Sequence, residues 1–351
     1  MDFGGGDEIR FERMGKAGVV TLTRPKALNA VTHRMVKALS AALEAWAADD
    51  GVEAVVIKAE GRAFSAGGDI LDIYNARQAG ESRVGFFADE YHLNAAIGRF
   101  EKPYVALIDG IVMGGGVGIS FHGSHRVLGE KARFAMPETG IGFFPDVGGS
   151  FLLSQLKGGI GMFLGLTGHR FGPGDALACG LATHAVSAED FPAILAGIAE
   201  GGSPDTVLKP FALDPPPDPT LNEAEKAAIG HHFTLGSLGD LIASLRKAAE
   251  TDGGEFARGA LDTLATRSPT SLHVAFRQIS FGEMLSLDEC MRMEFRIVNR
   301  MLEGHDFFEG IRALMIDKGD TPKWLPATLD DIDEAAIEAY FDPLPDRELG
   351  I

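Results

Sequence analysis

The sequence predicts an α/β protein with a largely parallel sheet, followed by a helical C-terminal region. In the first half of the chain, short runs rich in Val and Ile alternate with longer amphipathic segments, and strands joined by helical crossovers form parallel sheets. The stretch FALDPPPDPT at 211–220 breaks this alternation, because proline continues neither a helix nor a central strand. We therefore predict two regions, an α/β region over 1–205 that carries the functional site and a helical region over 206–351.

Hydrophobic spacing predicts the individual elements. A helix over 32–49 would begin at Thr32 as N-cap and bury an apolar face that includes Trp46. The apolar runs AVVIKA (Ala54–Ala59) and YVALI (Tyr104–Ile108) have the length of buried strands. The other predicted elements are strands at 10–13 and 19–23, helices at 84–100 and from 114 onward, and C-terminal helices at 222–231, 235–251, 254–266 and 286–303.

Composition limits the classes of partner and location. The chain has 351 residues, is 45% hydrophobic, and contains no run of about 18 apolar residues, which predicts no membrane-spanning helix. Its beginning, MDFGGGDEIRFER, lacks a basic stretch followed by an apolar one, so we expect no secretory signal. The two cysteines lie outside any CxxC pattern, which favours a reducing, cytoplasmic setting. A formal charge of −18 argues against nucleic acid and anionic membrane as partners but not against a small anionic ligand.

Two glycine-rich turns follow the runs AVVIKA and YVALI. One is GRAFSAGGDI at 61–70 and the other is DGIVMGGGVG at 109–118. Both would lie at the carboxyl ends of strands, where open α/β sheets bind ligands. Glycine lets a ligand approach the backbone closely, and free N–H groups at a helix start attract negative charge. Two such donors converging on one carbonyl oxygen would form an oxyanion hole; the alternative is a pair of tight turns with no chemistry.

Other catalytic and binding motifs are missing from the sequence. Neither glycine turn has the GxGxxG or Gly-Lys pattern of a phosphate-binding loop, and no GxSxG predicts a serine-hydrolase elbow. No HExxH or paired Cys/His spacing suggests a metal site. We therefore expect neither a metal nor a cofactor.

Two acids stand in the otherwise apolar stretch FAMPETGIGFFPDVGG at 134–149. Glu138 would activate water or attack a carbonyl itself, and Asp146 would orient the water or handle protons. Two acids in a partly desolvated pocket also push one pKa upward and separate acid from base roles. The structural alternatives are a first-turn glutamate after Pro137 and a helix N-cap at Asp146.

The order and spacing of these segments resemble the crotonase (enoyl-CoA hydratase/isomerase) superfamily. The matching stretches are RPKALNA at 24–30, FSAGGD at 64–69, GIVMGGGVG at 110–118, Pro-Glu at 137–138 and PDVGG at 145–149. The resemblance implies a crotonase-like core of ββα repeats arranged as a spiral, with a helical C-terminal region. It implies that the N–H groups of Gly68 and Gly115 form an oxyanion hole for a coenzyme A thioester, with coenzyme A belonging to the substrate. The substrate-binding residues that it implies are Lys26, Ala27, Leu28, Ala66, Gly67, Asp69, Ile70, Gly114 and Phe144.

The acids make the chain resemble one branch of that superfamily in particular. Typical hydratases have a glutamate where this chain has Gly118, retain a second one at Glu138, and have glycine where this chain has Asp146. The stretch MPETGIGFFPDVGG resembles the 3-hydroxyisobutyryl-CoA hydrolase branch instead, as do EYHLN from Glu90 onward and the segment 304–319. This resemblance implies catalysis by Glu138 and Asp146 and substrate contact by Glu90. The implied reaction converts 3-hydroxyisobutyryl-CoA, and also 3-hydroxypropionyl-CoA, to the free hydroxy acid and coenzyme A in valine breakdown.

Three questions stay open at this point. An atypical enoyl-CoA hydratase or isomerase is an alternative, which Gly118 disfavours, and an inactive acyl-CoA-binding protein is another, which the retained acids and turns disfavour. The sequence does not decide whether Glu138 acts as general base or nucleophile. Superfamily members often form trimers or dimers of trimers, so the resemblance allows a homo-oligomer.

Overall fold

The computed structural model describes residues 1–351, which form two compact units that interleave along the chain. The first unit comprises Met1–Asp69, Asp89–Ala135 and Arg170–Thr220, and the second comprises Ile70–Ala88, Met136–His169 and Leu221–Ile351. The last passage between the units therefore lies at the end of the proline-rich stretch 211–220. The division into regions 1–205 and 206–351 stays a prediction.

The first unit contains both sheets. Six strands form the main sheet in the order β1-β2-β3-β5-β7-β9, and three strands form a second sheet in the order β4-β6-β8. The pairing of β1 with β2 is antiparallel and the other pairings are parallel, as predicted. The strands are β1 (Ile9–Met14), β2 (Ala17–Leu22), β3 (Ala54–Ala59), β4 (Ala63–Ser65), β5 (Tyr104–Ile108), β6 (Ile111–Met113), β7 (His125–Leu128), β8 (Arg133–Ala135) and β9 (His184–Ala185).

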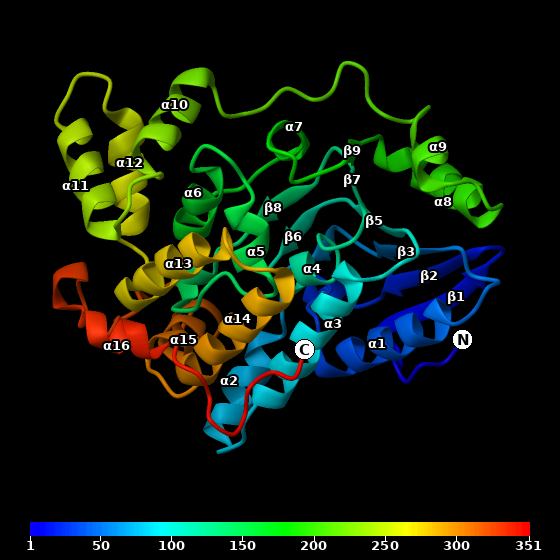
Figure 1. The fold of residues 1–351 in the computed structure, drawn as a ribbon, viewed down its shortest axis with the longest axis horizontal. Helices are drawn as coiled ribbons and strands as arrows, with labels where there is room; N and C mark the ends of the chain where they lie inside the picture. The colour runs from blue at the N-terminus through cyan, green and yellow to red at the C-terminus, as the bar shows by residue number, and fades with distance from the viewer. The chain divides into compact units, whose positions relative to one another are not determined.

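Helices cover both faces of the main sheet. Helix α1 (His33–Ala47) begins as predicted, because the Thr32 hydroxyl accepts a hydrogen bond from the Met35 N–H at 3.2 Å. Its Trp46 lies over Gly18 of β2, where a Cβ would stand 2.6 Å from the indole ring, and Figure 1 shows α1 along β1 and β2. The neighbouring residue, Val19, points to the opposite face and shares an apolar cluster with Ile194 of α8 (Phe191–Ala199).

The remaining helices of the first unit are short, apart from α3, which runs through both units. They are η1 (Pro25–Ala27), α4 (Gly115–Gly118), α7 (Pro173–Ala178), η3 (Ala188–Asp190) and α9 (Pro204–Leu208), and α3 spans Val84–Gly98.

The chain passes three times from the main sheet to the second sheet, from β3 to β4, from β5 to β6 and from β7 to β8. This order is the predicted ββα repeat. One expectation was wrong in detail, since the two glycine turns follow β4 and β6 rather than β3 and β5 directly. Strands β4 and β6 have 3 residues each, too few for a periodic pattern to reveal them.

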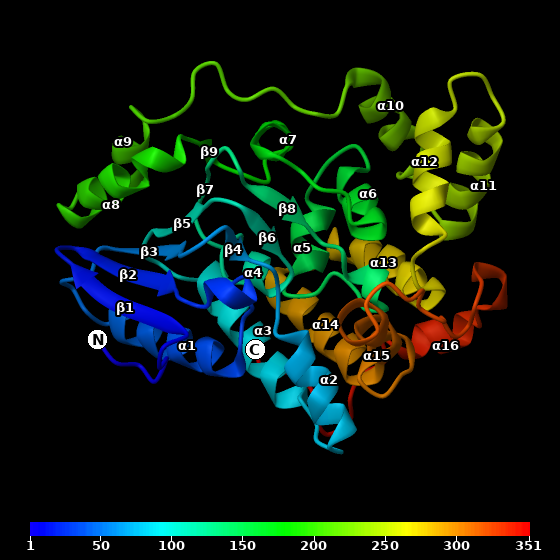
Figure 2. The same cartoon turned by 180° about the vertical axis from the view of Figure 1, so that it is seen from behind.

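The second unit is helical. Its elements are α2 (Ile70–Gln78), η2 (Glu138–Ile141), α5 (Gly149–Ser154), α6 (Ile160–Thr167), α10 (Glu223–His232), α11 (Leu238–Ala249), α12 (Glu255–Leu264), α13 (Pro269–Gly282), α14 (Leu287–Met301), α15 (Asp306–Ile311), η4 (Arg312–Ile316), η5 (Leu329–Asp331) and α16 (Glu334–Ala339). Figure 2 shows α11 and α12 side by side. The four predicted C-terminal helices are confirmed as α10, α11, α12 and α14. Helix α13 was missed, although Ser268 as N-cap and Pro269 at the first position are ordinary start signals.

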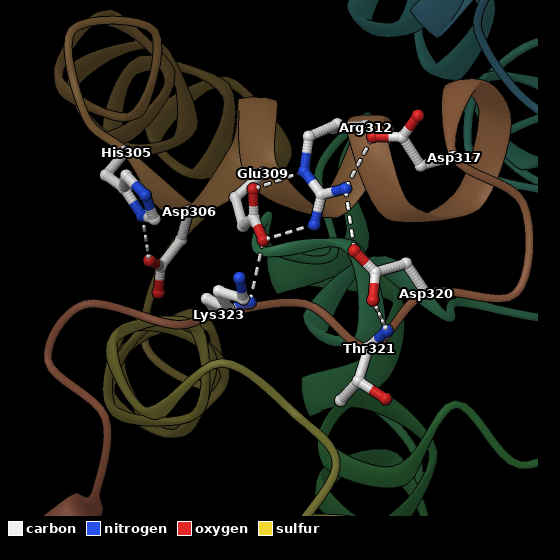
Figure 3. A network of polar contacts seen from close by, with 8 residues as sticks. All are labelled: His305, Asp306, Glu309, Arg312, Asp317, Asp320, Thr321 and Lys323. Carbon is white, nitrogen blue, oxygen red and sulfur yellow. Dashed lines mark hydrogen bonds and ion pairs between the residues drawn. The ribbon is translucent and has the colours of Figure 1, made fainter.

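A charged network fixes the segment that follows α15 (Figure 3). Arg312 binds Glu309 at 2.8 Å, Asp317 at 2.6 Å and Asp320 at 2.9 Å, and the Lys323 N–H donates to Glu309 at 2.8 Å. The hydrogen bond from Arg312 lowers the pKa of Glu309 to about 2. The network thereby holds residues 317–323 against α15.

No helix of the chain has both the length and the apolar composition that crossing a bilayer requires.

Candidate active site

The glycine turns meet at one edge of the second sheet. Strands β4 and β6 are parallel neighbours, so the turns that follow them leave the sheet side by side. A Cβ on Gly115 would lie 3.2 Å from the Gly68 nitrogen, so the two backbones are in contact. Neither the Gly68 nor the Gly115 N–H donates a hydrogen bond within the protein. Both donors are therefore available to one acceptor, as an oxyanion hole requires.

Glu90 lies beside this pair of glycines. It sits on α3 with 2% of its surface exposed. A Cβ on Gly115 would stand 2.8 Å from the Glu90 Oε1 atom, a distance that real Cβ contacts do not show. The structure thus places the Glu90 carboxylate next to Gly115, and a larger residue at position 115 would require Glu90 or the backbone to shift. Contact of Glu90 with a substrate stays a prediction.

The segments predicted to bind coenzyme A lie next to each other in the first unit. The Ala66 N–H donates to the Leu28 carbonyl at 2.9 Å, the Val31 N–H donates to Gly67 at 2.8 Å, and the Asp69 N–H donates to Val31 at 2.9 Å. These bonds join residues 28–31 to residues 66–69 like two short strands. The Asp69 carboxylate also pairs with Arg24 at 3.0 Å.

The other predicted binding residues are placed as follows. Lys26 and Ala27 are exposed in η1, and the Lys26 ammonium group makes no ion pair or hydrogen bond. Gly114 is the N-cap of α4 with φ at +46°. Ile70 opens α2 in the second unit, and Phe144 is buried there against Phe143, with ring centroids 4.7 Å apart. Their roles in binding stay predictions.

Asn29 supports the predicted coenzyme A segment and was not singled out from the sequence. Its Nδ2 donates to the carbonyls of Glu60 and Ala63 at 2.8 and 2.9 Å, and its Oδ1 accepts from the Arg24 N–H at 2.8 Å. Its backbone is left-handed, with φ at +54°, a conformation that asparagine tolerates better than most residues. One buried amide therefore fixes the loop that presents Lys26 and Leu28.

We expect Asn29→Ala to lower the free energy of unfolding by about 2–4 kcal/mol, because it leaves buried carbonyl and N–H groups without partners in a strained turn. Urea unfolding measures this change. The control is Asn75→Ala, which alters an exposed side chain on α2 and should change stability by less than about 0.5 kcal/mol. A loss below about 1 kcal/mol for Asn29→Ala would contradict this assignment.

The two predicted acids belong to the second unit. Glu138 opens η2 with 6% of its surface exposed, and Asp146 follows η2 with 5% exposed. Burial, and then the negative charge of Asp146, raise the pKa of Glu138 well above its ordinary value. The Glu138 Oε2 atom is buried and accepts no hydrogen bond. A backbone hydrogen bond from the Glu138 N–H lowers the pKa, but burial and Asp146 outweigh it, so Glu138 is a poorly solvated carboxyl with one unpaired oxygen.

Asp146 is not the N-cap of the following helix. The N-cap of α5 is Gly148, the Gly149 N–H donates to the Asp146 backbone carbonyl at 2.7 Å, and the N–H groups on either side of Gly149 donate to Glu294 of α14. Gly148 donates to Glu294 Oε2 at 2.7 Å and Ser150 donates to Oε1 at 2.9 Å. Burial, and to a smaller extent the negative charge of Asp146, raise the pKa of Glu294 to about 8, although these hydrogen bonds lower it. The sequence offered no sign of this contact, because Glu294 is 146 residues from Gly148.

Known proteins share the sequence and the fold of this chain. The family profile described as enoyl-CoA hydratase/isomerase matches residues 17–341. The chain belongs to this family. The crotonase-type fold that the sequence predicted is thereby confirmed, with its α/β core and helical C-terminal region.

Relatives extend over nearly the full chain. A protein of Danio rerio named "3-hydroxyisobutyryl-CoA hydrolase, mitochondrial" is 45% identical over 99% of this chain and 92% of its own length. The Homo sapiens protein of the same name is 40% identical over 98% of this chain and 90% of its own length. These relatives are mitochondrial by name, so the cytoplasmic location stays a prediction.

Two solved structures of family members share the whole fold. One, from Mycobacterium thermoresistibile, is titled a carnitinyl-CoA dehydratase and superposes with a TM-score of 0.90 at 41% identity, covering 98% of both chains. The other, from Rhodobacter sphaeroides, is titled an enoyl-CoA hydratase, with a TM-score of 0.88 at 37% identity over 98% of this chain and 100% of its own.

Proposed function

We propose that this chain hydrolyses the thioester of 3-hydroxyisobutyryl-CoA to 3-hydroxyisobutyrate and coenzyme A, a step of valine breakdown. The observation that carries the proposal is the full-length similarity, at 40–45% identity, to relatives named for this activity. The buried pair of acids, Glu138 and Asp146, supplies the chemistry that such a reaction needs.

The two glycine N–H groups polarise the thioester. In the proposed mechanism, the carbonyl oxygen accepts hydrogen bonds from Gly68 and Gly115, whose N–H groups have no partner in the protein. Each donor is worth about 3 kcal/mol in the transition state, because negative charge develops on that oxygen. The glycines thus lower the barrier to attack at the carbonyl carbon.

The acids complete the reaction. Glu138 takes a proton from the attacking water, or attacks the carbonyl carbon itself to give a mixed anhydride that water then cleaves. In both routes a C–O bond forms, the C–S bond breaks and the leaving thiolate takes up a proton. We assign the orientation of water or the delivery of that proton to Asp146. Glu90, beside Gly115, contacts the acyl group.

Coenzyme A needs local positive charge on this acidic chain. The formal charge is −18, so the phosphates must be held by individual cations. Lys26 is exposed and makes no ion pair, and it belongs to the loop that Asn29 fixes. We propose that Lys26 binds the phosphates of coenzyme A and that the backbone of residues 66–69 contacts the rest of the coenzyme A group.

Hydration or dehydration of an acyl-CoA is the second candidate, because two solved structures with the same fold are titled as a dehydratase and a hydratase. Gly118 argues against it, since it provides no side chain where typical hydratases have a glutamate.

A panel of 3-hydroxyisobutyryl-CoA, 3-hydroxypropionyl-CoA and an enoyl-CoA, followed by thiol release and by enoyl absorbance, tests the proposal. We expect hydrolysis of both hydroxyacyl thioesters. Their kcat/KM values should differ by no more than about 10–200-fold, because the two acyl groups differ by one methyl group. Change in enoyl absorbance without free thiol would reject it.

We expect Asp146→Asn to move the acid limb of the kcat/KM profile to lower pH, in addition to slowing the reaction. The negative charge of Asp146 raises the pKa of Glu138, and Glu138 must be ionised to act as base or nucleophile. Removing that charge lowers the pKa of Glu138, so the active form persists to lower pH. Initial rates between pH 5 and 9 measure the shift, and an acid limb that stays in place or moves upward would refute the coupling.

A further inference from the structure

Side chains from two C-terminal helices hold the backbone on both sides of Asp146. On one side, the Gln278 Nε2 atom of α13 donates to the Pro145 carbonyl at 2.6 Å. On the other side, the Glu294 carboxylate of α14 accepts from the Gly148 and Ser150 N–H groups at 2.7 and 2.9 Å. Gln278 and Glu294 are both 0% exposed. All these residues belong to the second unit.

The backbone between these anchors is strained. Val147 is left-handed with φ at +52°, and Gly148 follows with φ at +82°. A β-branched residue in this region is a strained outlier that persists only where its surroundings impose it. A backbone bond from the Gly149 N–H to the Asp146 carbonyl at 2.7 Å closes the turn, and the side-chain hydrogen bonds to Pro145, Gly148 and Ser150 hold it at either end. The conformation of this turn determines the position and direction of the Asp146 side chain.

A structural cap alone does not account for this arrangement. A helix N-terminus is usually capped by the local Ser, Thr, Asn or Asp, and Asp146 stands just before α5. A fully buried carboxylate is a costly substitute, because both its charge and its polar atoms are removed from water. The Glu294 carboxyl nevertheless accepts two backbone hydrogen bonds at 2.7 and 2.9 Å while burial raises its pKa to about 8. The Asp146 carboxylate, which lies between the two anchored segments, raises the pKa of Glu138.

We propose that Glu294 and Gln278 are positioning residues for catalysis, which hold Asp146 at the place from which it acts with Glu138. This inference rests on the proposed function. It assigns the helical C-terminal region a part in the chemistry, because both residues come from helices of that region. The catalytic acids and the helices that position them are separated by more than 130 residues of chain.

The test is Glu294→Gln, which keeps the shape but offers one acceptor where two N–H groups donate. We expect kcat to fall about 10–100-fold, the size of effect seen when a residue that orients a metal ligand is removed, while KM changes less than about 3-fold. The matched control is Glu283→Gln, an exposed glutamate at the end of α13 with no ion pair, which should leave kcat unchanged. Gln278→Met removes the other anchor without changing a charge, and carries the test if Glu294→Gln does not fold.

A double-mutant cycle separates positioning from general loss of stability. If Glu294 acts through Asp146, the Glu294→Gln/Asp146→Asn protein should be no slower than Asp146→Asn alone. Folded single variants with kcat within about 2-fold of the wild type, or losses that multiply in the double variant, would overturn the inference while leaving the proposed function intact. A wild-type protein that releases no thiol would instead reject the proposed function. In that case a crystal structure of Glu294→Gln still tests the inference, because Asp146 should have moved from its wild-type position.

Discussion

Glu138→Gln should lower kcat for thioester hydrolysis by about 10³-fold while the protein stays folded. The amide has nearly the same shape, but it neither takes a proton from water nor attacks a carbonyl, and proton transfer by a positioned group is commonly worth 10²–10⁴-fold. Steady-state thiol release by purified variant and wild type measures the effect. Glu44→Gln, an exposed change on α1, is the control and should leave kcat unaltered. A Glu138→Gln enzyme within about 10-fold of the wild type would remove Glu138 from the mechanism.

The same variant has a second signature in stability. Burial and Asp146 raise the pKa of Glu138 above its ordinary 4.5 in the folded protein, so ionisation is harder in the folded than in the unfolded chain. The stability contribution of this group is therefore complete below the unfolded-state pKa and is lost as the pH rises through the folded-state pKa. Glu138→Gln should melt at a higher temperature than the wild type at pH 8, and the difference should vanish near pH 4. An equal or lower melting temperature at pH 8 would contradict the burial of this charge.

Isotope labelling distinguishes the two routes open to Glu138. When water cleaves the glutamyl carbonyl of a mixed anhydride, turnover in ¹⁸O water places the label in the Glu138 carboxylate. When water attacks the acyl carbon, the label enters the product and Glu138 stays unlabelled. Mass spectrometry of the peptide that contains Glu138, after many turnovers, reports which group carries the label.

Gly115→Ala should reduce kcat by about 10²-fold, close to the loss of one oxyanion-hole donor. The new methyl group would stand 2.8 Å from Glu90 Oε1 and 3.2 Å from the Gly68 nitrogen. Both neighbours would have to shift, and one of them is the second donor of the proposed oxyanion hole. Thiol-release kinetics with a thermal melt measure the loss and verify folding.

Gly85→Ala is the matched control for that substitution. Gly85 lies in α3, the helix that carries Glu90, and a Cβ there meets nothing within 4 Å. We expect this variant to keep wild-type kcat. Wild-type rates for a folded Gly115→Ala protein would contradict the assignment of the oxyanion hole.

The main sheet could be predicted because its signals are local. AVVIKA and YVALI are continuous apolar runs, and they form β3 and β5 over the predicted residues. Thr32 begins α1 through its own hydroxyl group. Strands β4 and β6 were missed because 3 residues carry no period, although it is these strands that bring Gly68 and Gly115 together.

The candidate site was predicted only where adjacent residues carry the chemistry. The glycine turns and the acids at 138 and 146 stand in recognisable stretches, and the structure brings Gly68, Gly115 and Glu90 together in one unit and Glu138 and Asp146 together in the other. Glu294 could not be found in this way, because it reaches Gly148 across 146 residues. Such a contact is defined by packing of α14 on α5 and leaves no mark in the neighbouring sequence.

Product analysis with wild-type protein and 3-hydroxyisobutyryl-CoA tests the central claim most directly. Free thiol is measured with a thiol reagent and 3-hydroxyisobutyrate by mass spectrometry, while absorbance reports the enoyl thioester that loss of water would form. We predict equal amounts of thiol and hydroxy acid with no enoyl thioester. Formation of the enoyl thioester without thiol, or no reaction at all, would contradict the assignment of this chain as a thioester hydrolase.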